Sequence, residues 1–156
     1  MWCDIHSFAE VRKNNRWEKV WDVFKFDPYC REKDDPEYTC HPFFWRNYGI
    51  FWFLWDVRNM SESKFISDNR WLPDDVCQEI KDEFDPIWWD HSESYIFLKE
   101  LLDFDYSEEF IDRRPYYGQQ AISYNDFLWT NFFDILEELK QIWDPKNVRI
   151  VFWFDN

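Results

Sequence analysis

Glycine is scarce in this chain: its 156 residues include only Gly49 and Gly118. Phosphate-binding loops of the P-loop and Rossmann types need several glycines at fixed spacing, because backbone N–H groups must approach the phosphates closely. No stretch of the sequence has that spacing. The shortage therefore excludes both of these loop types.

Long apolar runs and a leader pattern are also missing. The longest apolar run, residues 49–55, is far shorter than the roughly 20 residues that cross a bilayer. The opening Met-Trp-Cys-Asp-Ile-His has neither the basic start nor the apolar segment of a signal peptide. We therefore expect a cytoplasmic protein that has no membrane partner.

Cysteines are few and unevenly spaced. The four are Cys3, Cys30, Cys40 and Cys77, and no C-x-x-C pair occurs. A cytosolic chain keeps its thiols reduced, so we predict free thiols rather than disulfides. A zinc site at Cys30, Cys40 and His41 would lack a fourth ligand. No structural metal or cofactor is therefore expected.

Positive charge is the last shortage. Lys and Arg number 18 against 32 Asp and Glu, which gives a net charge of −14. Between Asp74 and Asp112, many acidic side chains are opposed only by Lys81 and Lys99. Because nucleic-acid binding needs a basic surface, direct binding to DNA or RNA is disfavoured.

Aromatic residues, in contrast, are abundant. They make up 24% of the chain, with 12 Trp, and hydrophobic residues make up 46%. This composition is too apolar for a disordered chain, and the length suits one packed domain over residues 1–156. So many indoles also suggest that some lie at an interface, and a homodimer is one possibility.

Two segments predict a sheet. Asn14-Asn15 suits a two-residue hairpin turn between residues 3–13 and 16–24, and this turn would pair Arg12 with Trp17. The same register pairs Glu10 with Lys19 and Phe8 with Trp21, and all three pairs are chemically favourable. Residues 148–154 alternate as an apolar strand that needs a partner, and we place it beside the hairpin.

Helical patterns fill much of the remainder. We expect a buried helix over residues 46–58, short helices near 76–84 and 99–104, and a long helix over 125–142. Asp74 or Asp75 is the expected cap of the second helix, and Asn125 or Asp126 that of the last. Residues 26–42 and 106–120 are expected to be loops, with a brief strand at 95–98. The predicted class is α+β, with an antiparallel or mixed sheet covered by helices on one face.

The first candidate for chemistry is Asp4 with His6. Two residues apart on a strand, their side chains share one face, so the carboxylate can orient the imidazole. His91, beside Asp90 and Ser92, could join them. Three readings stay open: a structural hydrogen bond, contact with a ligand, or a general base or divalent-metal site.

The second candidate is the set Arg46, Asn47, Tyr48, Arg58 and Arg70. Guanidinium groups with aromatic planes can converge on a phosphate-bearing or nucleotide-like ligand. The alternative is that these arginines only neutralise nearby carboxylates in an acidic protein.

The third candidate is the acidic stretch, with Asp82, Glu83 and Asp85 near its centre. Ordered carboxylates can occupy the basic groove of a nucleic-acid-binding protein, and their long-range field speeds the encounter. The alternative is a solvated surface that has no partner.

Several motifs together resemble a widespread family of small, uncharacterised phage and bacterial proteins that often begin Gly-Cys-Asp-Ile-His. The resemblance implies an accessory protein that acts in the host cytoplasm, with inhibition of a defence system as its leading role. The candidate residues that match are Asp4, His6, Arg46, Asn47, Tyr48, Arg58, Arg70, His91 and Ser92. The segments that carry the resemblance are Cys3-Asp4-Ile5-His6, Arg46-Asn47-Tyr48, Val57-Arg58-Asn59, Leu72-Pro73-Asp74-Asp75-Val76, His91-Ser92 with Glu100-Leu101-Leu102, and Val148-Arg149-Ile150-Val151-Phe152.

Three hypotheses follow, and binding is favoured over catalysis. The leading one is a counter-defence protein that sequesters a nucleotide-derived small molecule in a polar pocket. The second is an acidic, anti-CRISPR-like inhibitor that blocks a host nucleic-acid-binding defence protein through Asp82, Glu83 and Asp85. The third is a divalent-metal hydrolase built on Asp4, His6 and His91.

Overall fold

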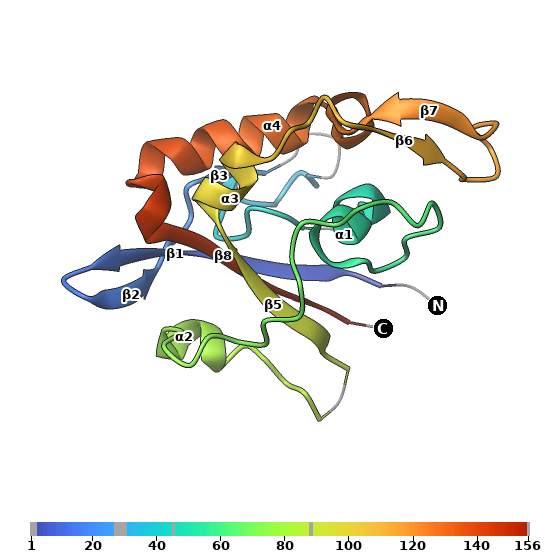
Figure 1. The fold of residues 1–156 in the computed structure, drawn as a ribbon. Helices are drawn as coiled ribbons and strands as arrows, with labels where there is room; N and C mark the ends of the chain where they lie inside the picture. The colour runs from blue at the N-terminus through green and yellow to red at the C-terminus, as the bar shows by residue number, and fades with distance from the viewer. Residues whose placement is uncertain (1–2, 27–30, 45, 88, 156) are drawn as a thin grey trace.

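A four-stranded antiparallel sheet forms the centre of the molecule (Figure 1). The computed structural model describes residues 3–26, 31–44, 46–87 and 89–155. The strand order is β2-β1-β8-β5. These strands are β1 (Ile5–Lys13), β2 (Arg16–Lys19), β5 (His91–Phe97) and β8 (Val148–Phe154).

The hairpin turn forms where the asparagine pair predicts it. Asn14 and Asn15 have φ values of 49° and 60°, the positive values that a type I′ turn requires. The register pairs Arg12 with Trp17 and Glu10 with Lys19, which confirms both predictions. β2 ends at Lys19, so the predicted Phe8–Trp21 pair lies beyond the strand.

The C-terminal strand β8 is paired on both edges, with β1 and with β5. All seven of its residues are buried, which explains why the segment is apolar at every position except Arg149. The prediction that it lies beside the N-terminal hairpin is confirmed.

Three helices cover one face of the sheet (Figure 1). They are α1 (Tyr48–Trp55), α3 (Leu98–Asp103) and α4 (Tyr124–Ile142). Phe51 and Phe53 of α1 and Phe132 of α4 share one hydrophobic cluster with Ile5 and Val11 of β1. The α+β class is therefore confirmed. No described helix is both long and apolar enough to cross a membrane.

The opposite face is also covered, which was not expected. The one-turn helix α2 (Gln78–Lys81) lies there (Figure 1), and its Ile80 packs with Phe8, Val151 and Trp153. The face of β1 that carries His6 is therefore partly a second core.

A buried ion pair lies on this second face. Glu10 and Arg149, both almost fully buried, join through Oε2 and Nε at 2.6 Å. The other Glu10 oxygen accepts from the Cys77 backbone at 2.7 Å. Arg149 also binds Asp75 at 2.7 Å. The expectation that Asp74 or Asp75 caps α2 is therefore wrong. The N-cap residue is Cys77, and its side chain makes no capping hydrogen bond.

Several element boundaries differ from expectation. The segment 106–120 is not all loop, because β6 (Glu109–Asp112) pairs with β7 (Gln120–Ser123). Ser123, rather than Asn125 or Asp126, caps α4. A small sheet of β3 (Phe24–Lys25) and β4 (Tyr38–Thr39) and a 3-10 turn, η1 (Pro145–Asn147), complete the fold.

The predicted thiols are free wherever the structure describes them. Cys3, Cys40 and Cys77 form no disulfide. Cys30 lies outside the described residues.

Candidate functional site

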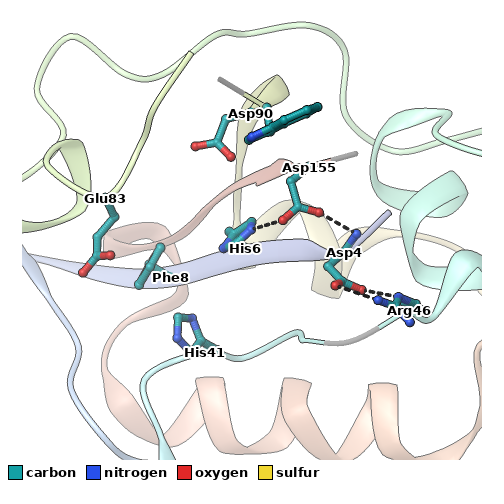
Figure 2. Close-up of a pocket in the computed structure, with 9 residues that line it drawn as sticks. Asp4, His6, Phe8, His41, Arg46, Glu83, Asp90 and Asp155 are labelled. Atoms are coloured by element: carbon teal, nitrogen blue, oxygen red, sulfur yellow. Dashed lines mark hydrogen bonds and ion pairs between the residues drawn. The ribbon is translucent and has the colours of Figure 1, made fainter. Parts of the chain in front are cut away.

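A surface cavity of about 550 Å³ lies beside the N-terminal half of β1 (Figure 2). Its lining comes from β1, from the segment after β4, from the loop between α2 and β5, and from the chain end after β8. Imidazoles, carboxylates and one guanidinium dominate it. The lining residues are Asp4, His6, Phe8, His41, Arg46, Glu83, Trp89, Asp90 and Asp155.

Asp155 joins the two central strands at the cavity. One carboxylate oxygen accepts from the Asp4 backbone N–H at 2.9 Å, and the other lies 2.9 Å from His6 Nε2. Burial alone would raise the pKa of Asp155, but the hydrogen bonds from His6 and Asp4 and the nearby imidazoles outweigh it and lower that pKa. The His6 ring also stacks on Trp153. The imidazole is thus held by a carboxylate and by an aromatic plane.

Arg46 and Asp4 form the next part of the site. Arg46 Nε lies 2.7 Å from Asp4 Oδ1, and Nη2 donates to Oδ2 at 3.3 Å (Figure 2). This two-point contact fixes the plane of the guanidinium at the cavity wall.

His41 supplies a second imidazole. Its Nδ1 lies 3.0 Å from the Ser7 carbonyl oxygen, and because a carbonyl only accepts, Nδ1 carries the hydrogen and Nε2 is left as an acceptor. Burial lowers the pKa of His41 below 6.5, so the ring is neutral at pH 7. The sequence had suggested His41 only for a zinc site.

The remaining carboxylates come from the acidic stretch. Glu83 lies 3.8 Å from the buried Lys19 ammonium. Asp90 accepts through Oδ2 from the Asp85 backbone at 2.7 Å, and within the described part of the chain its Oδ1 has no hydrogen-bond partner. The neighbouring Trp89 is 66% exposed. This side of the cavity therefore offers a carboxylate oxygen as a hydrogen-bond acceptor and an exposed indole ring.

Of the predicted site residues, Asp4, His6 and Arg46 line the cavity together. His91 lies beside it, because β5 pairs it with Phe154, next to Asp155. Its Nδ1 contacts Ser92 Oγ at 2.9 Å, and its Nε2 is buried with no partner among the described residues. His91 and Ser92 are therefore neighbours of the cavity rather than part of its wall.

The residues around α1 have structural contacts. Asn47 caps the helix by accepting from the Ile50 N–H at 3.3 Å. The Arg58 guanidinium lies 5.7 Å from the centre of the Tyr48 ring. It also interacts with Cys3, one residue before Asp4. Asn47, Tyr48 and Arg58 therefore do not line the cavity.

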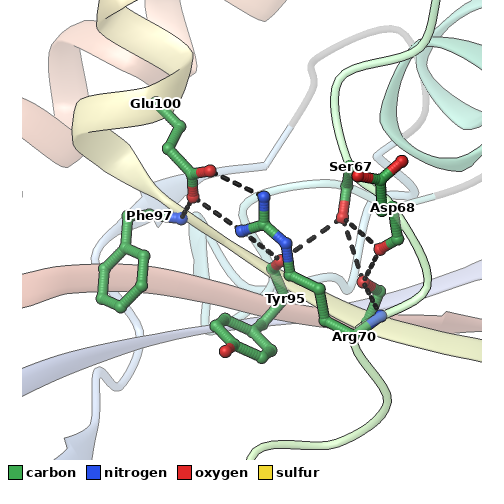
Figure 3. Close-up of polar contacts among 7 residues, drawn as sticks. Ser67, Asp68, Arg70, Tyr95, Phe97 and Glu100 are labelled. Carbon is green, nitrogen blue, oxygen red and sulfur yellow. Dashed lines mark hydrogen bonds and ion pairs between the residues drawn. The ribbon is translucent and has the colours of Figure 1, made fainter.

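Arg70 does not line the cavity. Its two terminal nitrogens each lie 2.7 Å from an oxygen of Glu100 (Figure 3). It also reaches the Tyr95 carbonyl at 3.4 Å. Burial would raise the pKa of Glu100, but Arg70 and the Phe97 N–H lower it. This pair connects the loop before α2 to α3, as the neutralising alternative proposed.

The acidic candidates Asp82, Glu83 and Asp85 are all exposed. Asp82 accepts from Gln78 at 2.6 Å, and Asp85 Oδ1 accepts from the Ile87 N–H at 3.1 Å. These bonds are local, so the three carboxylates remain available at the surface, and Glu83 also reaches the cavity.

A metal site on Asp4, His6 and His91 does not assemble. Asp4 binds Arg46, His6 binds Asp155 and His91 binds Ser92. In the part of the chain that the structure describes, no three His, Cys, Asp or Glu side chains form a group that could hold a metal ion.

Sequence reasoning missed Asp155. It named Asp90 only as a neighbour of His91, and it considered His41 only as a zinc ligand. Asp155 had one usable signal: if residues 148–154 pair antiparallel with β1, the residue after the strand falls beside Asp4. Comparison of the chain with protein-family models, with curated proteins and with solved structures finds no match.

Proposed function

We propose that the cavity beside β1 binds and sequesters a nucleotide-derived small molecule. The observation that carries this proposal is the convergence of Asp4, His6 and Arg46 on one cavity, where Asp155 binds Asp4 and His6, and Asp4 binds Arg46. The volume of about 550 Å³ falls within the range of small-molecule sites. The exposed ring of Trp89 adds a plane on which a base can stack.

The polar groups suit the separate parts of such a ligand. The guanidinium of Arg46 can donate to a phosphate. The Nε2–H of His6 is used by Asp155, so His6 can donate to a phosphate through Nδ1 in its protonated form. The neutral His41 can accept, through Nε2, a hydrogen bond from a ribose hydroxyl. The chain's resemblance to phage and bacterial proteins supports a counter-defence role, in which removal of a nucleotide signal silences a host response.

Ligand binding can be tested with matched arginine variants. We expect nucleoside monophosphates to raise the melting temperature of the purified protein and to bind in calorimetry. Arg46→Gln removes a cavity donor and should weaken binding about tenfold or more, the usual cost of losing a charge-assisted bond. Arg113→Gln is the control, because Arg113 makes a comparable exposed ion pair with Glu62 and does not line the cavity.

Two results would contradict this proposal. One is the absence of any thermal shift or heat across nucleosides, monophosphates and cyclic nucleotides, together with no nucleotide released when the freshly purified protein is denatured. The other is equal binding by Arg46→Gln and the unaltered protein, which would place the ligand elsewhere.

A second candidate function rests on the exposed carboxylates Asp82, Glu83 and Asp85. With a net charge of −14, this surface suits a basic groove on a nucleic-acid-binding defence protein. Binding to such a partner should weaken steeply with salt. Binding should also be lost in the triple variant Asp82→Asn, Glu83→Gln and Asp85→Asn. The matched control, in which the exposed Asp103, Glu109 and Asp134 are replaced by Asn, Gln and Asn, should still bind.

A further inference from the structure

We infer that the cavity selects a guanine base, with the Asp90 carboxylate at the base edge and Trp89 against the base plane. This inference rests on the proposed function and specifies which ligand the same cavity takes. Four carboxylates line the cavity, those of Asp4, Glu83, Asp90 and Asp155.

Three of the four carboxylates already have a cationic or imidazole partner. Asp4 binds Arg46, Asp155 binds His6, and Glu83 faces Lys19. Asp90 differs, because within the described residues its hydrogen bonds are with the backbone of Asp85 alone and it forms no ion pair. One of its oxygens therefore remains as an acceptor, on a residue that is partly buried.

Such an acceptor discriminates among bases. A carboxylate accepts hydrogen bonds but donates none when ionised. Guanine presents two adjacent donors, N1–H and the 2-amino group, which can pair with Oδ1 and with the second lone pair of Oδ2, whose first lone pair accepts from the Asp85 N–H. Adenine presents one donor beside an acceptor nitrogen, and uracil places a carbonyl on each side of its only N–H. The Asp90 carboxylate therefore matches guanine best and repels the edge of uracil.

Trp89 and Arg46 complete the arrangement. Trp89 directly precedes Asp90 in the chain, lines the same cavity and is 66% exposed, so a base at Asp90 can stack on its indole. In Figure 2, Asp90 and Arg46 lie on opposite sides of the His6–Asp155 pair. A nucleotide can thus place its base near Asp90 and its phosphate near Arg46, away from the unpaired carboxylate.

The test compares guanosine, inosine, adenosine and uridine 5′-monophosphates by isothermal titration calorimetry. Inosine monophosphate lacks only the 2-amino group, so it isolates one bond to the carboxylate. We expect guanosine monophosphate to bind about tenfold more tightly than inosine monophosphate, and uridine monophosphate to bind most weakly.

Variants assign the preference to its residues. Asp90→Asn keeps an oxygen for the Asp85 N–H but loses the charge, and it should reduce the guanosine-to-inosine ratio to about one. Asp103→Asn, an exposed aspartate on α3, should leave the ratio unchanged. Trp89→Ala should weaken the binding of all four ligands alike, whereas Trp71→Ala, which removes a similarly exposed ring outside the cavity, should not.

The outcomes separate this inference from the proposed function. If none of the four nucleotides binds, the base assignment fails, and the proposed function fails with it when nucleosides and cyclic nucleotides also do not bind and no nucleotide is released on denaturation. If they bind through Arg46 with equal affinities, or if Asp90→Asn keeps the guanosine preference, the cavity is a nucleotide site but the base assignment is overturned.

Discussion

At the scale of single residues, the most consequential contact is the buried pair of Glu10 and Arg149. Both side chains are almost completely removed from water. Arg149 also lies 4.0 Å from the centre of the Trp17 ring and binds Asp75. A charge in such a place is tolerated only while its partner is present. The pair therefore decides whether the second face of the sheet stays packed.

Glu10→Gln should be strongly destabilising. It removes the charge opposite Arg149 and leaves that guanidinium buried with only the exposed Asp75, at a cost of about 3 kcal/mol in the free energy of unfolding. Urea denaturation followed by circular dichroism measures this loss. The double variant Glu10→Leu with Arg149→Met should recover part of it, because no unpaired charge remains buried, although the Cys77 N–H loses its acceptor. Failure to recover would mean that the pair also specifies the packing.

Asp155→Asn should reveal a pH-dependent contribution at the candidate site. The folded protein lowers the pKa of Asp155 below 3.8, so the ionised carboxylate stabilises the fold above about pH 4, and this stabilisation is lost as pH falls through the lowered pKa. Allowing for partial exposure, we expect the variant to lose about 1 kcal/mol at pH 7. Chemical denaturation from pH 3 to pH 7 should show that the difference in the free energy of unfolding between the variant and the unaltered protein shrinks as the pH falls. A difference in the free energy of unfolding that stays constant with pH would contradict the assignment to the Asp155 charge.

At the scale of elements, the clearest conflict between a residue type and its backbone conformation lies in α4. Trp129 interrupts the helix with φ 62° and ψ 172°, a region that residues other than glycine rarely occupy. The side chain is 69% exposed and lines a second cavity of about 540 Å³. Burial of the indole therefore offsets little of the backbone cost.

Trp129→Gly should stabilise the protein. Glycine adopts this backbone conformation without strain, so we expect a gain of about 1 kcal/mol, seen as a higher melting temperature. Gln141→Gly is the control, because this exposed position follows ordinary helical geometry and should lose about 1 kcal/mol. A loss at Trp129 similar to that at Gln141 would show that the bend carries no strain.

Local patterns predicted those elements whose cause is local. The hairpin follows from Asn14-Asn15, and β8 follows from a short, almost wholly apolar segment that needs paired neighbours. The β6–β7 hairpin was missed because its strands are short, partly exposed and separated by a turn region read as loop. Asp75 looked like a cap, but a partner 74 residues away, Arg149, takes its carboxylate instead.

The candidate site was predicted only in part for the same reason. The i, i+2 spacing of Asp4 and His6 follows from strand geometry, and both line the cavity. The group that fixes them, Asp155, comes from the other end of the chain. Arg70 carries no local sign that Glu100 will bind it. Long-range pairing thus decided which of the polar candidates share a site.

At the scale of the whole molecule, one sheet carries two hydrophobic clusters, and each contains a buried cysteine. Cys3 belongs to the cluster under α1, α3 and α4, and Cys77 to the cluster under α2. Burial raises the pKa of the Cys77 thiol to about 12 and also raises that of Cys3. Both thiols are therefore protonated and unreactive until the structure opens. Because they ionise near pH 9 only when unfolded, stability should fall as pH rises above that value.

The two thiols can show whether the clusters unfold together. Alkylation with iodoacetamide at pH 8.5 in increasing urea, read by peptide mass spectrometry in a Cys30→Ser background, gives one midpoint for each cysteine. Because β8 contributes side chains to both clusters, we expect Cys3 and Cys77 to become reactive at the same urea concentration, in step with the loss of circular dichroism. Reaction of Cys77 at a lower concentration would mean that the segment around α2 detaches alone. Since that segment leads into the loop with Trp89 and Asp90, such detachment would open the cavity while the rest of the sheet stays folded.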